Sequence, residues 1–307
     1  MNIIAHKSIF LFISGLLVLA SILAIAVWGL KPGLDFVGGS LLEVEFIGKR
    51  PDVETVKRVL EPLGFGAVLI QPTGERGLIL RFKDVDEETH QQLLLRLSEL
   101  EFREGQVNKE SGVTEKRFDT IGPTIGRELK QNALVALALA VAAIVLYIAW
   151  AFRKVSRPVS SWKYGVAAVA ALIHDILIPS GVFAALGNFR GVEVDTLFVT
   201  ALLTIMGFSV HDTIVVFDRI RENLYGLKIV EPFEVTVNRS INQTLTRSLN
   251  TSLTVLLVLG AIFFLGGEST KYFSSALIIG IIFGTYSSIF VASPLLVIWN
   301  QLSSRKK

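Results

Sequence analysis

The sequence predicts a polytopic α-helical membrane protein with six transmembrane helices and one inserted α+β domain outside the membrane. Hydrophobic residues make up 51% of the 307 residues, a share too large for a soluble protein of this length. Five apolar stretches are long enough to cross a bilayer, which takes about 20 residues of helix, and a sixth becomes long enough when the polar segment before it is included. Between the first two stretches, residues 31–130 carry the alternating and helical patterns of a separate globular domain.

The first transmembrane helix is expected within residues 1–30, where Ile9 to Leu30 is almost unbroken in its apolar character. A cleaved signal peptide is the alternative, but its apolar region would span only about 7–15 residues. The run here is longer and leads into Trp28, a residue type typical of membrane interfaces. We therefore expect an uncleaved first span.

The segment 31–130 is expected to fold as a ferredoxin-like head domain. Strand patterns fall at 40–47, 66–71, 77–82 and 113–121, and helical patterns fall at 51–63 and 86–102. The resulting order, βαββαβ, is the split-βαβ arrangement. Pro72-Thr73-Gly74 is expected to form the turn between the second and third strands.

A glycine-rich motif, Gly33-Leu34-Asp35-Phe36-Val37-Gly38-Gly39, joins the first span to this domain. Its glycines allow positive φ angles and close backbone contact. A phosphate-binding loop would need a strand before it and a helix after it, whereas here a span precedes and a strand follows. A structural turn is the favoured interpretation, with a ligand site as the alternative.

Five further spans are expected within 131–300, at 132–152, 162–186, 196–217, 244–265 and 276–299, with a tail at 301–307. The apolar part of the fifth, 253–265, is too short to cross about 30 Å of hydrocarbon. The helix must therefore recruit a polar segment that contains Arg247, and we expect this segment to face the bundle interior or a water-filled cleft. The alternative is a tilted helix whose Arg247 side chain reaches the headgroups.

The sixth span carries small residues at a strict four-residue spacing, which lets another helix approach closely. They are Ala276, Gly280, Gly284, Ser288 and Ala292. This pattern is a helix-packing signal rather than a chemical one.

Basic residues predict the orientation of the chain. They concentrate between spans two and three, between spans four and five, and at the C-terminus, whereas the other two loops hold one base each, matched by acids. By the positive-inside rule, both termini are cytoplasmic and the head domain is extracytoplasmic. The loop 222–242 should then lie along the cytoplasmic face, with a helix of its own that starts at Pro232.

The candidate chemistry lies in two His-Asp pairs inside the spans, His174-Asp175 and His211-Asp212. Helical rise places Asp175 about 18 Å from Lys163 and Asp212 about 10 Å from Arg219, depths too different for a shared metal site. Arg247 falls at a depth comparable to Asp212, where a carboxylate and a guanidinium can satisfy one another.

This matched depth suggests a proton relay. Burial favours a neutral carboxyl group and a nearby guanidinium favours an ionised one, so relative movement of Asp212 and Arg247 would load and unload a proton. His211 is either a second relay residue or a helix-packing residue. The alternative for Asp212 is a hydrated position close to the membrane surface.

Three segments, taken in this order, resemble a known family: GLDFVGG at 33–39, HDTIVVFDRIREN at 211–223 and TLTRSLNTS at 244–252. The chain resembles the SecD/SecF family, Sec translocon accessory subunits of the RND superfamily, over essentially its whole length. The resemblance implies an RND-like half-bundle in the bacterial inner membrane, which SecD completes to twelve spans. It also implies that the proton-motive force helps to draw preproteins out of the SecYEG channel, with YajC and YidC as further candidate partners.

Within that resemblance, the residues for proton transport correspond to Asp212 and Arg247, and SecD would supply a further aspartate. Asp175 lies in a family-typical His-Asp motif and is a further candidate for the proton relay, with His211. Some relatives have Asn in place of His211, which argues against an essential role for that histidine. The resemblance also marks a cytoplasmic motif, formed by Asp218, Arg219, Arg221, Glu222 and Asn223. It implies no cofactor, no metal and no nucleic acid.

Two other functions stay open on the residues alone. A half-size RND-type exporter of lipids or small molecules would prefer an exported region larger than 31–130. A passive assembly factor would use the buried charges only to hold the bundle together. Covalent catalysis is not expected, because the chain has no cysteine and its Ser, His and Asp residues do not form a recognised nucleophile motif.

Overall fold

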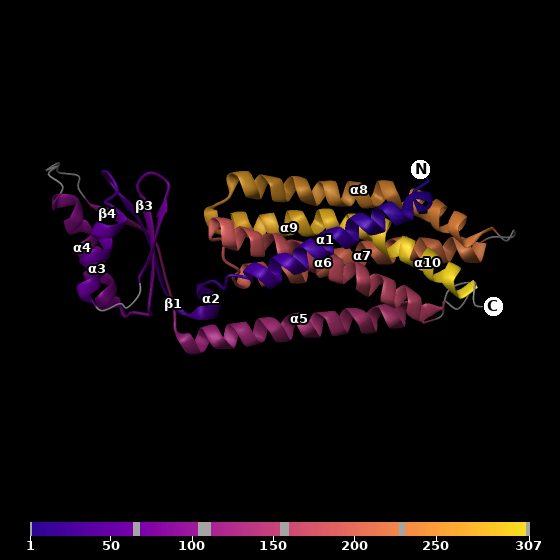
Figure 1. Ribbon diagram of the computed structural model, residues 1–307, viewed down its shortest axis with the longest axis horizontal. Helices are drawn as coiled ribbons and strands as arrows, with labels where there is room; N and C mark the ends of the chain where they lie inside the picture. Colours follow the sequence, from indigo (N-terminus) through magenta and orange to yellow (C-terminus); the bar gives the residue numbers. More distant parts are fainter. Residues whose placement is uncertain (1, 64–67, 104–111, 154–159, 227–230, 305–307) are drawn as a thin grey trace. The chain divides into compact units, whose positions relative to one another are not determined.

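The computed structural model describes residues 2–63, 68–103, 112–153, 160–226 and 231–304 (Figure 1). The chain divides into two compact units, one formed by Met1–Lys31 with Leu134–Lys307 and the other by Pro32–Ala133. The first unit is a helix bundle, and the second, the head domain, is a small α+β domain.

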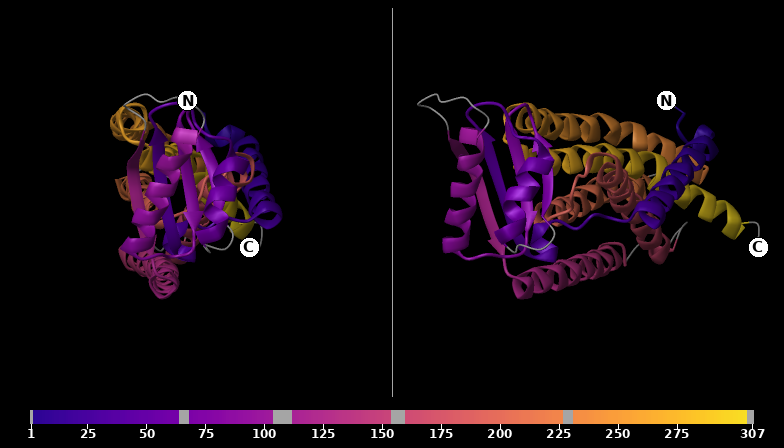
Figure 2. Two further views of the ribbon diagram at one scale, coloured as in Figure 1. Left: turned by 90° about the vertical axis from the view of Figure 1, so that its left-hand side faces the viewer. Right: turned by 60° about the vertical axis from the view of Figure 1, so that its left-hand side comes forward.

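The head domain is one antiparallel sheet with two helices on one of its faces (Figure 2). Strands β1 (Gly39–Phe46), β2 (Leu69–Thr73), β3 (Gly77–Phe82) and β4 (Val113–Ile121) lie in the order β2-β3-β1-β4. Helices α3 (Val53–Leu60) and α4 (Glu87–Arg103) follow β1 and β3. Alternate strand residues such as Leu42 and Leu80 are buried against Val56 and Leu93 of these helices. The predicted ferredoxin-like βαββαβ topology is confirmed.

The second strand differs from its predicted position. It was expected at 66–71, of which 66 and 67 lie outside the described residues, and Pro72-Thr73 was expected in the turn. In the structure β2 runs through Thr73, and the turn begins at Gly74, which has a φ of 54°. Pro72 is tolerated because β2 is an edge strand, where a missing N–H need not remove a ladder hydrogen bond.

The start of α4 gives a pH-dependent prediction. The Asp86 carboxylate accepts the backbone N–H of Thr89 at 3.0 Å, and hydrogen bonds from Thr89 hold the pKa of this carboxyl group below its usual value. Its stabilising contribution is therefore complete above the unfolded-state pKa, about 3.9, and is lost as the pH falls through the lower folded-state pKa.

We expect Asp86→Ala to speed amide hydrogen exchange in α4 roughly fivefold at neutral pH, because the helix loses its N-terminal cap. Asp86→Asn should keep most of the protection, since its side-chain oxygen still accepts the Thr89 N–H. Hydrogen-exchange mass spectrometry on the full chain measures both. A difference between wild type and Asp86→Ala that stays constant down to pH 3 would contradict the assigned role.

Six helices in the described part of the chain are long and apolar enough to cross a membrane. They are α1 (Lys7–Trp28) with the preceding 3-10 turn η1 (Ile4–His6), α5 (Pro123–Ala151), α6 (Ser161–Arg190), α7 (Thr196–Gly226), α8 (Phe233–Leu265) and the last span. The last span consists of α9 (Glu268–Ser287), a π-helical turn η3 (Ser288–Ala292) and α10 (Ser293–Ser304). Helices α6, α7 and α9 form the buried centre of the bundle, and α1, α5 and α8 lie at its periphery.

Most of these helices extend beyond the apolar segments that predicted them. Helix α5 starts at Pro123 rather than at 132, and α7 continues to Gly226 rather than ending at 217. The prediction of a separate helix that starts at Pro232 is wrong as well, because Phe233–Leu265 is one continuous helix and Pro232 is its N-cap. Helical hydrogen bonding does not stop where the apolar residues stop, so hydropathy sets the membrane-crossing part but not the helix ends.

Two of the central helices contain an irregularity. Helix α6 contains Pro179, and without an N–H this residue leaves the backbone carbonyl of Asp175 without its usual helical partner. The last span changes to π-helical geometry at Ser288, and the Ser293 hydroxyl donates a hydrogen bond to the Ser288 carbonyl at 3.0 Å.

Candidate functional site

Asp212 lies on α7 with its side chain inside the bundle, 7% exposed. The Ser248 hydroxyl of α8 donates to its Oδ1 atom at 2.5 Å. The Oδ2 atom is buried and has no hydrogen-bond partner among the described residues. An unsatisfied carboxylate oxygen costs free energy in a low-dielectric interior, so Oδ2 is a site for a further polar partner.

The predicted ion pair between Asp212 and Arg247 is not formed in the structure. The matched depth is confirmed, because Ser248, the next residue along α8, bonds to Asp212. Successive helix residues point about 100° apart, however, so Arg247 is turned away from the bundle and is exposed. His211 is exposed on α7 for the same reason.

The polar segment of α8 has two different faces. Thr244, Ser248 and Ser252, spaced four residues apart, are buried inside the bundle, as expected from the sequence. The other polar residues of the segment are exposed instead: Thr246, Arg247, Asn250 and Thr251. One face of the segment therefore packs inside the bundle, as expected, and the other face lies on the surface of this chain.

Exposed polar side chains also follow one side of α7. Thr200, Thr204 and His211 are exposed there, together with Gly207. Both His211 and Arg247 are close enough to interact electrostatically with Asp212. We refer to Thr204 and His211 on α7, with Arg247, Asn250 and Thr251 on α8, as the polar rows; they flank the buried carboxylate.

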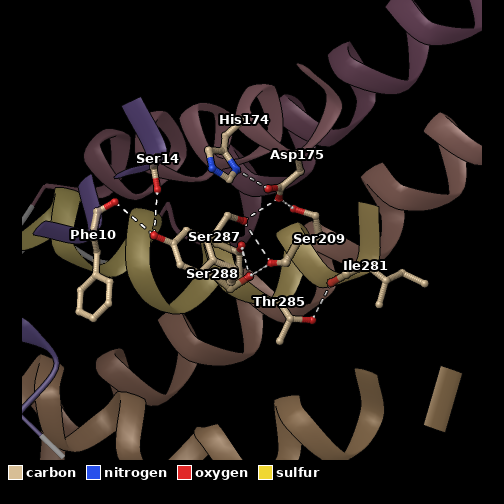
Figure 3. Close-up of polar contacts among 12 residues, drawn as sticks. Phe10, Ser14, His174, Asp175, Ser209, Ile281, Thr285, Ser287 and Ser288 are labelled. Atoms are coloured by element: carbon tan, nitrogen blue, oxygen red, sulfur yellow. Dashed lines mark hydrogen bonds and ion pairs between the residues drawn. The ribbon is translucent and has the colours of Figure 1, made fainter. Parts of the chain in front are cut away.

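Asp175 lies on α6 at the centre of the bundle, where it is completely buried (Figure 3). Its Oδ2 atom accepts hydrogen bonds from Ser209 of α7 at 2.5 Å and from Ser287 of α9 at 2.6 Å. Its Oδ1 atom lies 2.8 Å from Nδ1 of His174. One carboxylate thus joins three helices.

Further hydroxyl pairs continue between the helices. Thr213 of α7 bonds to Ser288 at 2.9 Å, and Ser252 of α8 bonds to Thr285 of α9 at 2.5 Å. Of these hydroxyl residues, Ser248 and Ser252 belong to the polar segment of the fifth span, and Ser288 belongs to the small-residue series of the last span. The sequence did not identify the others as site residues: Ser209, Thr213, Thr285 and Ser287.

That small-residue series packs within the chain. Ala276, Gly280, Gly284, Ser288 and Ala292 are all buried. A Cβ atom on Gly280 would lie 2.2 Å from the Ile205 side chain of α7, and one on Gly284 would lie 3.3 Å from Cβ of Ser209. The glycines therefore let α9 approach α7 closely enough for the Asp175 contacts to form.

The glycine-rich motif is a tight turn of the head domain. Residues Leu34–Val37 form a short helix, α2, and Gly38 and Gly39 follow with φ angles of 78° and 121°. A Cβ on Gly38 would lie 2.9 Å from Cα of Pro123, and one on Gly39 would lie 2.7 Å from the Phe82 carbonyl oxygen. Both positions need glycine for conformation and for space. Gly33 is the N-cap of α2, and Asp35 lies in its first turn.

The motif at the end of α7 joins this helix to the start of α8. Asn223 donates to Ser240 and to Gln243, each at 2.8 Å, and Arg219 donates to Gln243 at 2.7 Å. The remaining contacts are ion pairs within α7, Asp218 with Arg221 and Arg219 with Glu222. These residues fix the angle between α7 and α8. In the described ranges, no three His, Asp or Glu side chains gather to hold a metal.

Comparisons with known proteins agree with this architecture. The family model described as protein export membrane protein SecD/SecF, C-terminal, matches residues 103–302, and the model of the SecD/SecF GG motif matches residues 24–46. The protein translocase subunit SecF of Thermobaculum terrenum is 43% identical over 313 residues, covering 98% of this chain and 94% of that protein. The SecF subunit of Anaerolinea thermophila is 40% identical, with the same coverage of both chains.

The chain is also similar to solved structures. The crystal structure of SecDF, a translocon-associated membrane protein from Thermus thermophilus, superposes with a TM-score of 0.79 at 35% identity. A structure of SecDF in a super-membrane-facing form gives a TM-score of 0.65 at 34% identity. Both matches cover at least 98% of this chain but only 39% of the SecDF chain.

Proposed function

The chain belongs to the SecD/SecF family of protein export membrane proteins, and we propose that it works with SecD to drive preprotein translocation with the proton-motive force. In this proposal the chain supplies half of a twelve-span bundle, and SecYEG provides the channel that the preprotein leaves. YajC and YidC are candidate neighbours. Both termini are cytoplasmic and the head domain is extracytoplasmic, as the distribution of basic residues indicates.

The observation that carries this proposal is the exposure of the polar rows beside a buried carboxylate. Arg247 lies 18 residues before the end of α8 at Leu265, about 27 Å along the helix, and Asn250 and Thr251 lie deeper still. Insertion scales give about 2.5–3.5 kcal/mol for a charged side chain at the centre of a spanning helix, and the cost is smaller closer to the membrane surface. A single six-helix chain leaves this cost uncompensated, whereas a second bundle with an acidic residue would cover the rows and pair with Arg247.

The local chemistry of Asp212 supports proton coupling. Its Oδ1 atom is bound by Ser248 while its buried Oδ2 atom has no hydrogen-bond partner among the residues that the structure describes. A proton on Oδ2 would remove the buried charge, and approach of a cation would stabilise that charge instead. Arg247 is the nearest arginine candidate for this role, because its position on α8 adjoins Ser248.

Preprotein translocation into membrane vesicles that contain SecYEG, SecD and this chain tests the proposal. We expect a proton gradient to increase the amount translocated after the SecA-driven step, and an ionophore that collapses the gradient should remove the increase. Vesicles that lack this chain are the control. No response to the gradient would contradict the proposal. A response to a sodium gradient alone would make sodium the coupling ion, and gradient-driven lipid or small-molecule efflux would favour the exporter alternative.

A further inference from the structure

The Asp175 site has hydrogen-bond partners suited to both protonation states of its carboxyl group (Figure 3). When Asp175 is ionised, Ser209 and Ser287 both donate to its Oδ2 atom. The Ser287 hydroxyl also lies 3.1 Å from the backbone carbonyl oxygen of Gly284. If Asp175 carries a proton on Oδ2, it can donate to the Ser287 oxygen, and the Ser287 hydroxyl can then donate to Gly284.

This exchange of hydrogen bonds matters because burying a polar group without a hydrogen-bond partner costs free energy. A structural aspartate needs donors for its ionised form only. Here the rotation of one hydroxyl leaves every group around Oδ2 with a partner in either state, so the site can take up and release a proton without a helix moving. The second acceptor of Ser287 makes the site compatible with either protonation state of Asp175.

His174 is suited to orienting the carboxylate rather than to taking the proton. The neutral imidazole can donate its Nδ1–H to Oδ1 of Asp175 across 2.8 Å. Its Nε2 atom is buried and has no hydrogen-bond partner in the described part of the chain. A second proton on the ring would therefore bury an N–H donor without an acceptor, whereas a proton on Asp175 has acceptors.

Hydroxyl groups connect this site with the region of Asp212. Ser288, next to Ser287, bonds to Thr213, which directly follows Asp212 on α7. Ser288 also shares the Gly284 carbonyl with Ser287, at 2.9 Å. Among the described residues, the titratable groups near Asp175 are His174 on α6, Asp212 one turn beyond Ser209 on α7, and Tyr286 on α9, while α1 contributes only Ser14, bonded to Tyr286.

From this geometry we propose that Asp175 is a second proton-binding site of the bundle, with His174 as its positioning residue and Ser287 as the hydroxyl that switches acceptor. This inference rests on the proposed function, because it assigns the site to the same proton-coupled cycle as Asp212.

The test combines infrared spectroscopy with the translocation assay, both on the complex with SecD in vesicles. Infrared difference spectra between acid and alkaline pH should contain a protonated-carboxyl C=O band that is missing in Asp175→Asn. Ser287→Ala removes a donor from the ionised carboxylate and an acceptor from the protonated form. Because the hydrogen bond to the charged group is the stronger of the two, the half-point of this band should move to higher pH by about one unit. Ser180→Ala is the matched control, because the Ser180 hydroxyl is also buried but bonds to Ile176 within α6.

Two substitutions test the role of His174, one that keeps an N–H donor and one that removes it. His174→Asn keeps a side-chain N–H donor near the position of Nδ1 and should preserve the band and the gradient-dependent translocation. His174→Leu removes the donor and should shift the half-point to higher pH. Loss of the pH dependence itself in His174→Asn would make His174 the titrating group and overturn the assignment to Asp175.

The outcomes separate this inference from the proposed function. If wild type shows no gradient-dependent translocation, the proposed function fails, while the infrared titration still reports on Asp175. If wild type responds to the gradient but Asp175→Asn keeps the band and Ser287→Ala has the same half-point as Ser180→Ala, the inference is overturned. If Asp175→Asn does not assemble with SecD, the Ser287→Ala shift decides, because that variant keeps the carboxylate.

Discussion

Replacing Asp212 with Asn is expected to abolish the gradient-dependent part of preprotein translocation while SecD still co-purifies with the chain. The amide is nearly the same size and can still accept the Ser248 hydrogen bond that Oδ1 receives at 2.5 Å. It cannot bind or release a proton and carries no charge for Arg247 to stabilise. Translocation should therefore fall to the level measured when an ionophore has collapsed the gradient.

Two variants make this result specific. Ser248→Ala removes one donor to Asp212 but leaves the carboxylate, so it should reduce the gradient-dependent component and change its pH dependence without abolishing it. Arg247→Met should abolish the component if the cation controls the charge of Asp212. Unchanged stimulation in Asp212→Asn, with the complex assembled, would leave Asp212 as a structural residue and favour a passive role for the buried charges.

Gly181→Val is expected to cause a large loss of stability in the bundle. A Cβ atom on Gly181 of α6 would lie 2.5 Å from both Cα and Cβ of Ser21 on α1. Backbone atoms cannot rotate out of the way as a side chain can, so the two helices must separate. Overpacking of this kind costs about 1–3 kcal/mol, and loss of the α1–α6 interface adds to it.

Thermal unfolding of the purified chain in detergent, followed by circular dichroism, measures this effect. Gly165→Ala is the matched control on the same helix, because its Cβ would meet no closer atom than Cγ2 of Ile148 at 3.9 Å. It should leave stability unchanged or raise it slightly, since alanine favours the helix over glycine. Equal midpoints for Gly181→Val and Gly165→Ala would show that α1 does not pack on α6 as described.

The sequence was sufficient to predict the head-domain topology and the matched levels of Asp212 on α7 and Arg247–Ser248 on α8. Both follow from local rules: alternation and helical spacing identify strands and helices, and helical rise converts residue number into depth. The βαββαβ order and the contact between Asp212 and the Arg247–Ser248 level of α8 follow from these rules.

Which side of α8 contacts α7 could not be predicted in the same way. Polar residues occur on both sides of its polar segment, so the pattern does not tell which side meets α7. The structure places Ser248 against Asp212 and leaves Arg247 exposed, because the serine fits the close α7–α8 contact and a guanidinium does not. Likewise, Ser209 and Ser287 are ordinary small residues in sequence, and only the three-dimensional packing brings them to Asp175.

The irregularities in α6 and the last span lie beside the same carboxylate. Pro179 removes the helical hydrogen bond to the Asp175 carbonyl, and the π-helical turn begins at Ser288, directly after the Ser287 that binds the Asp175 side chain. Helices kink at prolines and at π-helical turns, because both interrupt the regular backbone hydrogen bonds. Two of the three helices that Asp175 joins therefore interrupt their backbone hydrogen bonding beside this carboxyl group, and the side-chain contacts of Asp175 hold them together where each helix is weakest along its own axis.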